Sequence, residues 1–394
     1  MFEALTPGRD DPIIALMLAF REDDRPDKVD LGVGIYRDAD GHTPVMEAIR
    51  EAELRLAEDQ KTKAYTALTG DPAFATAIRD LTLGNAVAPE RVAFAGTPGG
   101  SGALRQAYEL IASLAPDATI WLPTPSWPNH AAVLAYLKRP VRPYRYYDAA
   151  TGLLDREGML ADLAKVPKGD VVLLHGCCHN PSGADPSPDD WIAIAETFNE
   201  TGALPLIDLA YQGFGDGIEA DVAGLRTLAR KVPELLLCVS GSKTFGLYRD
   251  RAGVLLAVAP DANRQKLLQQ ALTTLNRNNY SFPPDHAGRL VTNVLTDAGL
   301  RQEWASELDQ MRNRINGLRR SFAEELRRAT NSDRFDGIAT QKGMFSLLPL
   351  TADQIDRLRQ DHGIYILGDG RINIAGLSDE SIPRVASSIT LTSR

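Results

Sequence analysis

Residues 235–251 have the sequence Leu235-Leu-Leu-Cys-Val-Ser-Gly-Ser-Lys-Thr-Phe-Gly-Leu-Tyr-Arg-Asp-Arg251, and this stretch decides the fold. It begins with an apolar run, Leu235–Val239, which predicts a short buried strand that ends at Gly241. Polar side chains follow directly. The strand therefore brings them to the carboxyl edge of the predicted sheet.

Four side chains beyond this strand have the chemistry of a cofactor site: Ser240, Ser242, Lys243 and Arg251. A lysine at the carboxyl end of a buried strand is poorly solvated, which lowers its pKa and leaves a nucleophilic amine. Two hydroxyls and a guanidinium beside it suit a phosphate dianion. These are the requirements of a lysine that holds pyridoxal 5′-phosphate (PLP) as a Schiff base. The alternative is a Gly/Ser turn with a surface lysine.

Length and composition indicate an ordinary globular protein. With 394 residues the chain exceeds what one hydrophobic core usually supports, so two domains are expected. Its 44% hydrophobic and 24% charged residues are typical of such proteins. A formal net charge of −9, without a basic tract, argues against a nucleic-acid partner.

Cysteine usage and the N-terminus predict the compartment. Of three cysteines two are adjacent, Cys177 and Cys178, which is neither a disulfide framework nor a zinc-ligand spacing. The N-terminus lacks the basic start and apolar core of a signal peptide. The longest apolar run, Ile13–Phe20, is too short to span a bilayer. We therefore expect a cytoplasmic protein without membrane contact.

The middle of the chain alternates between short apolar runs and helical patterns. This alternation predicts an α/β fold with a mainly parallel sheet and helices on both faces. Ligands of such sheets bind beyond the carboxyl ends of the strands. The predicted strands are 92–95, 119–122, 171–174, 204–207, 235–239 and 254–258.

The two ends of the chain have other patterns. Helices are predicted from Asp11-Pro12 through Phe20 and over 44–59, with a strand-like segment at 29–36 between them. Gly32 and Gly34 in that segment lack the third glycine of a dinucleotide fingerprint. Apolar residues three or four apart predict a long amphipathic helix over 297–329. The residues that follow this helix indicate a small α+β unit that pairs with the N-terminal segment.

Other predicted strands also end in polar residues. Gly100 and Ser101 lie in a glycine-rich loop that opens a helix, where backbone N–H groups bind anions; the alternative is a plain turn. Asp208 and Tyr211 follow the strand at 204–207, and this carboxylate could bind a pyridine nitrogen or cap the next helix.

Aromatic, imidazole and amide groups follow two more strands. Trp127 could stack on a planar cofactor ring or pack in the core, with His130 beside it. His175 and His179 could bind a metal, but no thiolate pair or carboxylate stands at useful spacing, so no metal is expected. Asn180 provides an amide in a turn.

Two arginines, Arg277 and Arg371, stand among apolar or turn residues, where a solvated charge is less expected. A guanidinium there can grip a carboxylate with two hydrogen bonds. Both are therefore candidate substrate-binding residues.

Taken together, these stretches resemble the fold-type I PLP enzymes, specifically the class I aminotransferases of the aspartate/aromatic branch. The resemblance covers nearly the whole chain. It is carried by Gly34-Ile-Tyr36, Gly99-Gly-Ser-Gly-Ala-Leu-Arg105, Pro125-Ser-Trp-Pro-Asn-His130, His175-Gly-Cys-Cys-His-Asn-Pro-Ser-Gly183, Asp208-Leu-Ala-Tyr211, Ser240-Gly-Ser-Lys-Thr-Phe-Gly-Leu-Tyr248, Arg251, Gly343-Met-Phe-Ser346 and Gly370-Arg-Ile-Asn373.

The resemblance implies a mainly parallel seven-stranded sheet flanked by helices, with a smaller α+β domain. The implied divisions are an N-terminal arm at 1–12, a small domain at 13–43 and 311–394, and a large PLP-binding domain at 44–310. It also implies a homodimer with shared active sites.

The resemblance also assigns cofactor roles. Lys243 would form the internal aldimine and then carry the proton. Asp208, supported by His130, would pair with the pyridinium nitrogen, and Tyr211 would hydrogen-bond the ring oxygen. Trp127 would stack on the ring and Asn180 would contact the cofactor. The implied phosphate ligands are Gly100, Ser101, Ser240, Ser242 and Arg251, with Tyr65 from the partner subunit.

Substrate roles follow in the same way. Arg371 would bind the α-carboxylate, aided by Asn180, Trp127 and the backbone of Gly34. Arg277, from the partner subunit, would meet a distal carboxylate. Phe345 and Phe282 complete the implied substrate-binding set.

Three positions depart from the pattern of the aspartate enzymes. Ser101 stands where those enzymes usually have threonine, and Phe282 stands where a small polar residue is usual. Asn276 stands where an apolar residue is common. An apolar ring near the side-chain pocket favours aromatic substrates. We therefore predict an aromatic-amino-acid aminotransferase that also accepts aspartate and glutamate and uses 2-oxoglutarate in a ping-pong mechanism. Aspartate aminotransferase proper is the alternative. Movement of Arg277 or domain closure would accommodate both substrate types.

Three other functions compete with this prediction. PLP-dependent decarboxylation or β-elimination would keep the cofactor, but Arg277 favours a dicarboxylate partner and hence transamination. A non-catalytic regulator on this fold would normally carry an added DNA-binding segment. A nicotinamide dehydrogenase would need the fingerprint glycines.

Overall fold

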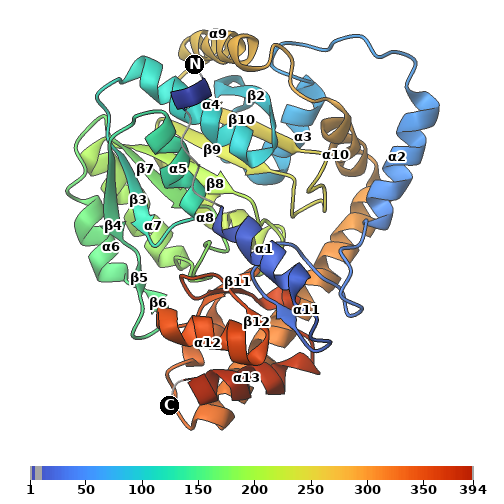
Figure 1. Cartoon of the computed structure of the whole chain (residues 1–394). Helices are drawn as coiled ribbons and strands as arrows, with labels where there is room; N and C mark the ends of the chain where they lie inside the picture. The colour runs from blue at the N-terminus through green and yellow to red at the C-terminus, as the bar shows by residue number, and fades with distance from the viewer. Residues whose placement is uncertain (1, 5–10, 393–394) are drawn as a thin grey trace.

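The computed structural model describes residues 2–4 and 11–392. Its centre is a seven-stranded sheet with the order β2-β10-β9-β8-β7-β3-β4 (Figure 1). Only β10 runs antiparallel to its neighbours, so the sheet is mainly parallel, as predicted. The strands are β2 (Val92–Pro98), β3 (Ile120–Thr124), β4 (Val141–Arg145), β7 (Val171–His175), β8 (Leu204–Leu209), β9 (Leu235–Ser240) and β10 (Ala252–Val258).

All six apolar runs predicted from the sequence are strands of this sheet. The two central runs that end at His175 and Ser240 are buried along their whole length. The chain returns from β9 into β10 through the short segment 241–251, which is why these two neighbours are antiparallel. The cofactor-like residues of 240–251 therefore lie in a tight connection at one end of the sheet.

Helices cover both faces of the sheet (Figure 1). Alternate residues of the strands enter two different core clusters: Val171 and Leu173 pack in one, and Val172 and Leu174 in the other. The helices over this part of the chain are α3 (Pro72–Thr82), α4 (Gly99–Leu114), α5 (Pro128–Tyr136), α6 (Arg156–Leu163), α7 (Pro188–Thr201), α8 (Ala223–Lys231), α9 (Ala262–Asn279) and α10 (His286–Thr296).

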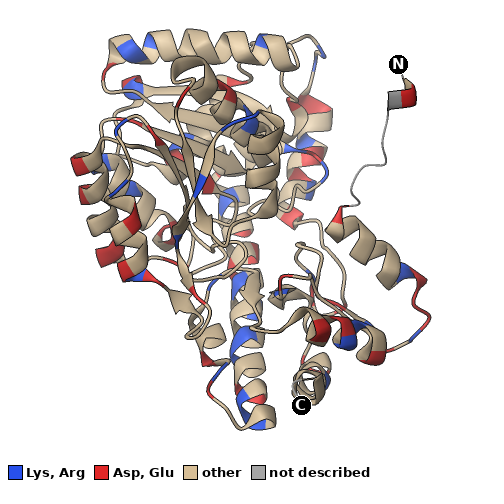
Figure 2. Ribbon diagram, turned by 60° about the vertical axis from the view of Figure 1, so that its left-hand side comes forward, with Lys and Arg blue, Asp and Glu red and all other residues tan. Residues whose placement is uncertain are grey.

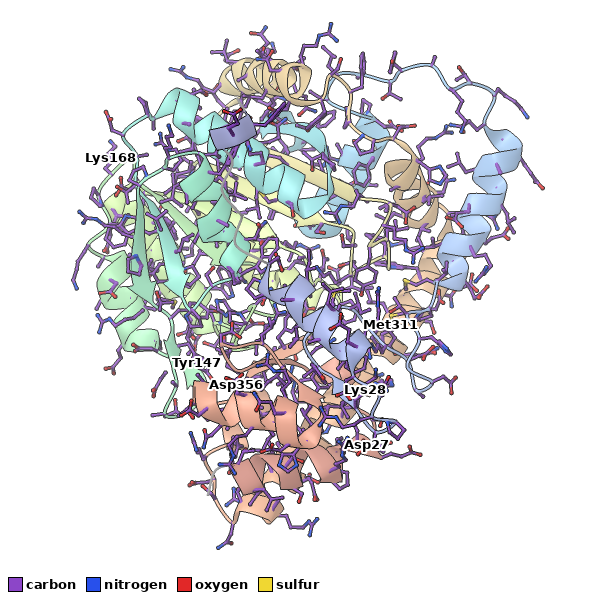
Figure 3. The ribbon with its side chains drawn as sticks, in the orientation of Figure 1. Asp27, Lys28, Tyr147, Lys168, Met311 and Asp356 are labelled. Atoms are coloured by element: carbon purple, nitrogen blue, oxygen red, sulfur yellow. The ribbon has the colours of Figure 1, made fainter. Side chains whose placement is uncertain are left out.

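The predicted long helix is α11 (Ala298–Thr330). Asp297 begins it by accepting a hydrogen bond from Leu300 N–H at 2.9 Å, and Asn331 ends it in the left-handed region at φ 50°. Leu300, Trp304 and other residues of the predicted stripe are buried. Figure 3 shows Met311 on this helix, between the sheet and the C-terminal elements.

The C-terminal elements pack beside the N-terminal segment. β1 (Val29–Asp30) pairs in parallel with β12 (Ile364–Tyr365), and Figure 3 shows Asp27 and Lys28 next to the C-terminal helices. The other elements here are α1 (Pro12–Glu22), β11 (Phe345–Leu347), α12 (Ala352–His362), β13 (Arg371–Asn373) and α13 (Ser381–Thr392). Helix α2 (Glu47–Asp59) lies apart from them and packs against α10 and α11. The hairpin of β5 (Tyr147–Asp148) and β6 (Leu153–Leu154) lies below the sheet.

Three sequence expectations need correction. The strand-like segment 29–36 is a strand only at Val29–Asp30, because the carbonyls of Val33 and Ile35 accept from the Asn373 side chain instead of a neighbouring strand. The helix expected from residue 44 begins at Glu47. Strand β4 was missed; it is a largely exposed edge strand that contains Pro143.

Charged residues lie mainly on the outer helices, where acidic and basic side chains are intermixed (Figure 2). Within residues 2–4 and 11–392 no helix has the length and apolar character that crossing a bilayer requires. Residues 5–10 of the expected N-terminal arm lie outside the described residues.

Candidate active site

A cavity of about 270 Å³ lies at the carboxyl ends of the parallel strands. It brings together most of the residues singled out from the sequence. These are Gly34, Gly100, Ser101, Trp127, Asn180, Asp208, Tyr211, Ser240, Ser242, Lys243, Arg251, Phe345 and Arg371. It is also lined by five residues that the sequence did not single out as site residues: Ile13, Leu104, His175, Cys177 and Ala210.

Lys243 follows the end of β9 and faces into this cavity. Its Nζ lies 5.1 Å from the centre of the Tyr211 ring. Burial lowers the pKa of Lys243 to about 8; the charge of Asp208 opposes this shift, and the cations Arg251 and Arg371 add to it. A useful fraction of the amine is therefore neutral and nucleophilic near neutral pH.

Asp208 lies at the end of β8 and is held by a buried imidazole. Its Oδ2 is 2.9 Å from His130 Nε2, and His130 Nδ1 is 2.8 Å from Ser126 Oγ. Burial acts to raise the pKa of Asp208, but the hydrogen bond and charge of His130 outweigh it, so the pKa is lowered. The carboxylate is thus ionised, oriented, and able to bind a cationic ring nitrogen.

His175 ends β7 directly beside Asp208 in the register of the sheet. Its Nδ1 accepts a hydrogen bond from the Asn180 N–H at 3.1 Å, so the proton of the neutral ring is on Nε2, which has no partner among the described residues. Burial lowers the pKa of His175 to about 3 and keeps the ring neutral. Its place at a strand end was the available signal for a role in this site.

The alternative metal site at His175 and His179 is not favoured by the geometry. The two rings lie 4.3 Å apart, and His179 Nδ1 is 2.8 Å from Ser182 Oγ. In the described part of the chain, two clusters of histidine, cysteine or carboxylate side chains are close enough to hold a metal, and neither contains His175 or His179.

An anion cradle forms where the start of α4 meets the β9–β10 connection. Arg251 Nη1 donates to Ser242 Oγ at 3.2 Å, and Ser242 N–H donates to Ser240 Oγ at 3.2 Å. A Cβ on Gly99 would lie 2.6 Å from Arg251 Nη2, and one on Gly100 would lie 2.8 Å from Ser240 Cβ. Only glycines let the helix start approach so closely, and Gly100 and Ser101 at this helix start line the cavity, where backbone N–H groups can bind an anion.

Arg371, on β13, presents a guanidinium without a carboxylate partner in the described chain. Its Nη1 donates to Asn180 Oδ1 at 3.3 Å, its Nη2 donates to the Gly32 carbonyl at 3.0 Å, and its Nε has no acceptor among the described residues. The side chain is 3% exposed, and burial lowers its pKa. A buried cation with neutral neighbours is suited to an incoming carboxylate.

Aromatic rings border the cavity on two sides. Trp127 packs edge-on against His130, with ring centres 5.2 Å apart. Phe345 packs edge-on against Tyr211 at 5.9 Å and lies under the Arg371 guanidinium at 4.4 Å. A planar cofactor and an apolar substrate side chain both find partners here.

Four predicted site residues do not line the cavity: His130 lies behind Asp208, and Tyr65, Arg277 and Phe282 form a separate surface cluster. Tyr65 is 82% exposed and stacks on Phe282, with ring centres 4.5 Å apart. Arg277, also exposed, donates to Ser281 Oγ at 2.5 Å. Within one chain this surface cluster does not reach the cavity.

Asn276, beside Arg277, has a structural task instead. It is fully buried, and its Nδ2 donates to the carbonyls of Leu68 and Gly96 at 2.9 and 3.1 Å. The departure from an apolar residue at this position is explained by these two bonds.

Comparison with known proteins now identifies the family. Residues 26–389 match the family model for aminotransferase class I and II. The chain belongs to this family.

Relatives match this aminotransferase along its whole length. It is 50% identical over 389 residues to an aromatic-amino-acid aminotransferase of Paracoccus denitrificans, covering 99% of both chains. It is 40% identical over 392 residues to an aspartate aminotransferase of Escherichia coli (strain K12), again covering 99% of both.

Solved structures agree. One is an aromatic amino acid aminotransferase with 3-indolebutyric acid, with a TM-score of 0.98, 49% identity and full coverage of both chains. Another is an aromatic-amino-acid aminotransferase from Burkholderia pseudomallei covalently bound to pyridoxal phosphate, with a TM-score of 0.96, 38% identity and full coverage of both chains. The seven-stranded fold predicted from the resemblance is confirmed.

PLP is the cofactor of this aminotransferase, and the cavity fits it. The cradle of glycines, hydroxyls and Arg251 suits a phosphate, and the ionised Asp208 suits a pyridinium nitrogen. Lys243 lines the same cavity as these two groups and has an amine of lowered pKa. The donor set therefore matches the phosphate, ring and aldehyde ends of the cofactor.

Proposed function

We propose that this aminotransferase exchanges amino groups between aromatic or acidic L-amino acids and 2-oxoglutarate or other 2-oxo acids, by a ping-pong mechanism. One observation carries the proposal. A single cavity contains both the Lys243 amine, with its pKa lowered to about 8, and the buried Arg371 guanidinium, whose hydrogen bonds go to neutral oxygens. Proton transfer and carboxylate binding are the two tasks that transamination requires of the protein.

The cofactor-binding residues have two roles: some bind the phosphate, and others keep the ring nitrogen protonated. Gly100, Ser101, Ser240, Ser242 and Arg251 hold the phosphate. Asp208 keeps the ring nitrogen protonated because its own pKa is lowered and His130 fixes its orientation. When bound, PLP supplies an electron-withdrawing ring that stabilises negative charge at the substrate Cα.

The other ring contacts follow from the geometry of the cavity walls. The Tyr211 hydroxyl and the Asn180 side chain line the cavity and would hydrogen-bond the ring oxygen of bound PLP, and Trp127 would stack on the ring face. These contacts fix the plane of the cofactor relative to Lys243.

Lys243 moves the proton. Its neutral amine would hold the cofactor covalently, and the same Nζ, free again while substrate is bound, would accept the proton from the substrate Cα. Arg371 holds the substrate α-carboxylate, with Asn180 and the Gly34 backbone beside it. The position of this carboxylate fixes which Cα–H bond faces Nζ.

The surface cluster acts in a second copy of the chain. We infer a homodimer in which Tyr65 reaches the phosphate and Arg277 reaches the distal substrate carboxylate of the partner subunit. Support comes from their exposure: Tyr65 is 82% exposed and stacks on Phe282, so a polar and an apolar surface are both open to a second copy of the chain.

Phe282 favours aromatic substrates. It lies in the surface cluster close to Arg277, so in the proposed dimer an apolar ring would border the site where Arg277 binds a distal carboxylate. The relatives named aromatic-amino-acid or tyrosine aminotransferase at 50% and 46% identity are consistent with this preference.

Aspartate aminotransferase proper is the second candidate. Arg277 is the observation that favours it, since a guanidinium binds a second carboxylate with two hydrogen bonds. Relatives named aspartate aminotransferase are 42% identical to the chain.

The decisive experiment is a kinetic panel over aspartate, glutamate, tyrosine, phenylalanine and tryptophan with 2-oxoglutarate as acceptor. The proposal expects turnover of both substrate classes. A kcat/KM for phenylalanine that is orders of magnitude below that for aspartate would leave aspartate aminotransferase proper as the function.

The division into domains is part of this proposal. We propose an arm at 1–12, a small domain at 13–43 and 311–394, and a large domain at 44–310, with a cytoplasmic location. The pairing of β1 with β12 and the position of Met311 partway along α11 support these boundaries.

A further inference from the structure

Arg319, on α11, is a buried cation outside the cavity. It is 1% exposed and is among the largest fully buried side chains. Its four hydrogen bonds all go to neutral oxygens, and Nε has no acceptor among the described residues. Burial lowers the pKa of Arg319 to about 10, so the side chain is still charged at neutral pH. A desolvated charge is costly, which makes its neighbours informative.

The oxygens that Arg319 binds belong mainly to one short segment. Nη2 donates to the carbonyls of Gly343 and Phe345 at 2.6 and 3.1 Å, and Nη1 donates to Ser346 Oγ at 2.5 Å and to the Ile338 carbonyl at 3.3 Å. The planar guanidinium binds two carbonyls two residues apart, which fixes the direction of the backbone between them.

The opposite side of this segment is packed against the loop that carries Asn180. A Cβ on Gly343 would lie 2.4 Å from Cys178 Cβ, and one on Gly183 would lie 2.6 Å from the Phe345 carbonyl. Lys342 N–H donates to the Gly183 carbonyl at 2.7 Å. The segment 342–346 is therefore held between Arg319 and the cavity wall with no room to shift.

The end of this segment reaches the carboxylate site. The Phe345 ring lies 4.4 Å under the Arg371 guanidinium, and a Cβ on Gly34 would lie 2.8 Å from Phe345 Cζ. Strands β11 and β13 also pair, with Leu347 opposite Arg371 and Phe345 opposite Asn373. A displacement of 343–346 would move Phe345 and Arg371 together.

We propose that Arg319 is a positioning residue for substrate-carboxylate binding: its hydrogen bonds to Gly343, Phe345 and Ser346 place the Phe345 ring and, through β11–β13, the Arg371 guanidinium. This inference rests on the proposed role of Arg371. Arg319 touches neither substrate nor cofactor, so its effect is on binding geometry.

The test compares Arg319→Met, Arg319→Lys and Ser346→Ala with Arg320→Met, which changes the exposed neighbour on the same helix. Steady-state kinetics with phenylalanine and the dissociation constant of 3-phenylpropionate, an aromatic monocarboxylate without an amino group, are measured on the PLP-loaded enzymes. Thermal unfolding and the visible PLP band report on the fold and the cofactor.

For Arg319→Met we expect KM and the 3-phenylpropionate dissociation constant to rise about tenfold while kcat changes less than about threefold, because misplaced binding groups cost affinity first. Arg319→Lys, which retains a charge and three donors, should recover part of the loss. Ser346→Ala removes one acceptor and keeps the cation, so a smaller rise of about threefold is expected. Arg320→Met should behave as the unmodified enzyme.

Unchanged 3-phenylpropionate binding in folded Arg319→Met and Ser346→Ala would overturn the proposal, and so would a fall in kcat and thermal stability without a change in KM. If Arg319→Met does not fold, Ser346→Ala alone decides. Arg371→Lys is measured in parallel. If it also leaves 3-phenylpropionate binding unchanged, the proposed carboxylate site itself is wrong; if only Arg371→Lys weakens binding, the inference about Arg319 alone fails.

Discussion

The cavity around Lys243 and the surface cluster of Tyr65, Arg277 and Phe282 differ in how completely one chain builds them. In the cavity the side chains are held by partners from distant segments, as Asp208 is by His130 and Arg371 by Asn180. In the surface cluster Tyr65 is 82% exposed, and the exposed Arg277 side chain donates a hydrogen bond to Ser281, four residues further along the chain.

The difference separates chemistry from selectivity. One chain positions the amine, the ring-nitrogen partner and the α-carboxylate ligand, which are common to all amino-acid substrates. The groups that would distinguish an acidic from an aromatic side chain lie on the surface, and in our proposal they act on a second copy. Changes in the cavity should therefore affect every substrate, and changes in the surface cluster should affect some.

Lys243→Ala should have the largest effect and abolish turnover of every substrate. We expect kcat to fall by about 10⁴-fold or more, because the nucleophile and the general base are both lost. The covalent PLP band in the visible spectrum should disappear as well. A variant that keeps an unchanged band would show that another group holds the cofactor.

Asp208→Asn should lower kcat for phenylalanine and aspartate alike by about 10²- to 10³-fold, since a neutral amide cannot keep the ring nitrogen protonated. The measurement is kcat for both substrates, with PLP content determined by absorbance. A substrate-dependent loss would contradict the division between the two regions.

Arg277→Ala should change one substrate class only. Loss of a guanidinium–carboxylate pair is expected to lower kcat/KM for aspartate by about 10²-fold and to leave phenylalanine nearly unchanged. Arg264→Ala, an exposed arginine on the same helix, is the matched control. An equal loss for both substrates would mean that Arg277 maintains structure and does not select substrates.

Phe282→Ser should act in the opposite sense. Removing the ring is expected to lower kcat/KM for phenylalanine by about tenfold, because an apolar contact of a few kcal/mol at most is lost, while aspartate is spared. Since Tyr65 stacks on Phe282, the affinity for PLP is measured alongside. A larger fall in kcat/KM for aspartate than for phenylalanine, relative to the unmodified enzyme, would reverse the assignment of this residue.

The smallest expected effect is a shift in pH dependence. Lys243 attacks PLP only when neutral, and its pKa is lowered to about 8, so the rate at which apoenzyme attaches PLP should rise with pH through about 8 and then level off. Asp208 raises the pKa of Lys243, so Asp208→Asn should move this midpoint to lower pH. Stopped-flow absorbance gives both curves. A midpoint that stays near 10, as for an exposed lysine, would contradict burial of the amine.

The sequence predicted the cavity well because its residues end apolar strands. In a mainly parallel sheet such residues meet at one edge, so Asp208 and Lys243 could be grouped without any knowledge of their contacts. Strand β4 could not be predicted in this way, because its exposed residues and Pro143 do not form an apolar run.

Contacts between distant side chains could not be predicted in this way. Arg319 precedes Arg320 in the sequence, and only the packing of α11 makes one buried and the other exposed. The stack of Tyr65 on Phe282 joins segments far apart in the chain, and the register that sets His175 beside Asp208 is a property of the folded sheet.

Complementation between two variants that each turn over aspartate poorly tests the central claim most directly. Lys243→Ala and Arg277→Ala chains are purified separately, mixed under conditions that exchange subunits, and assayed with aspartate and 2-oxoglutarate. In a mixed dimer one site combines the intact Lys243 of one chain with the intact Arg277 of the other, so aspartate turnover should appear well above that of either variant alone. No gain on mixing, with subunit exchange verified, would contradict an active site built from two chains.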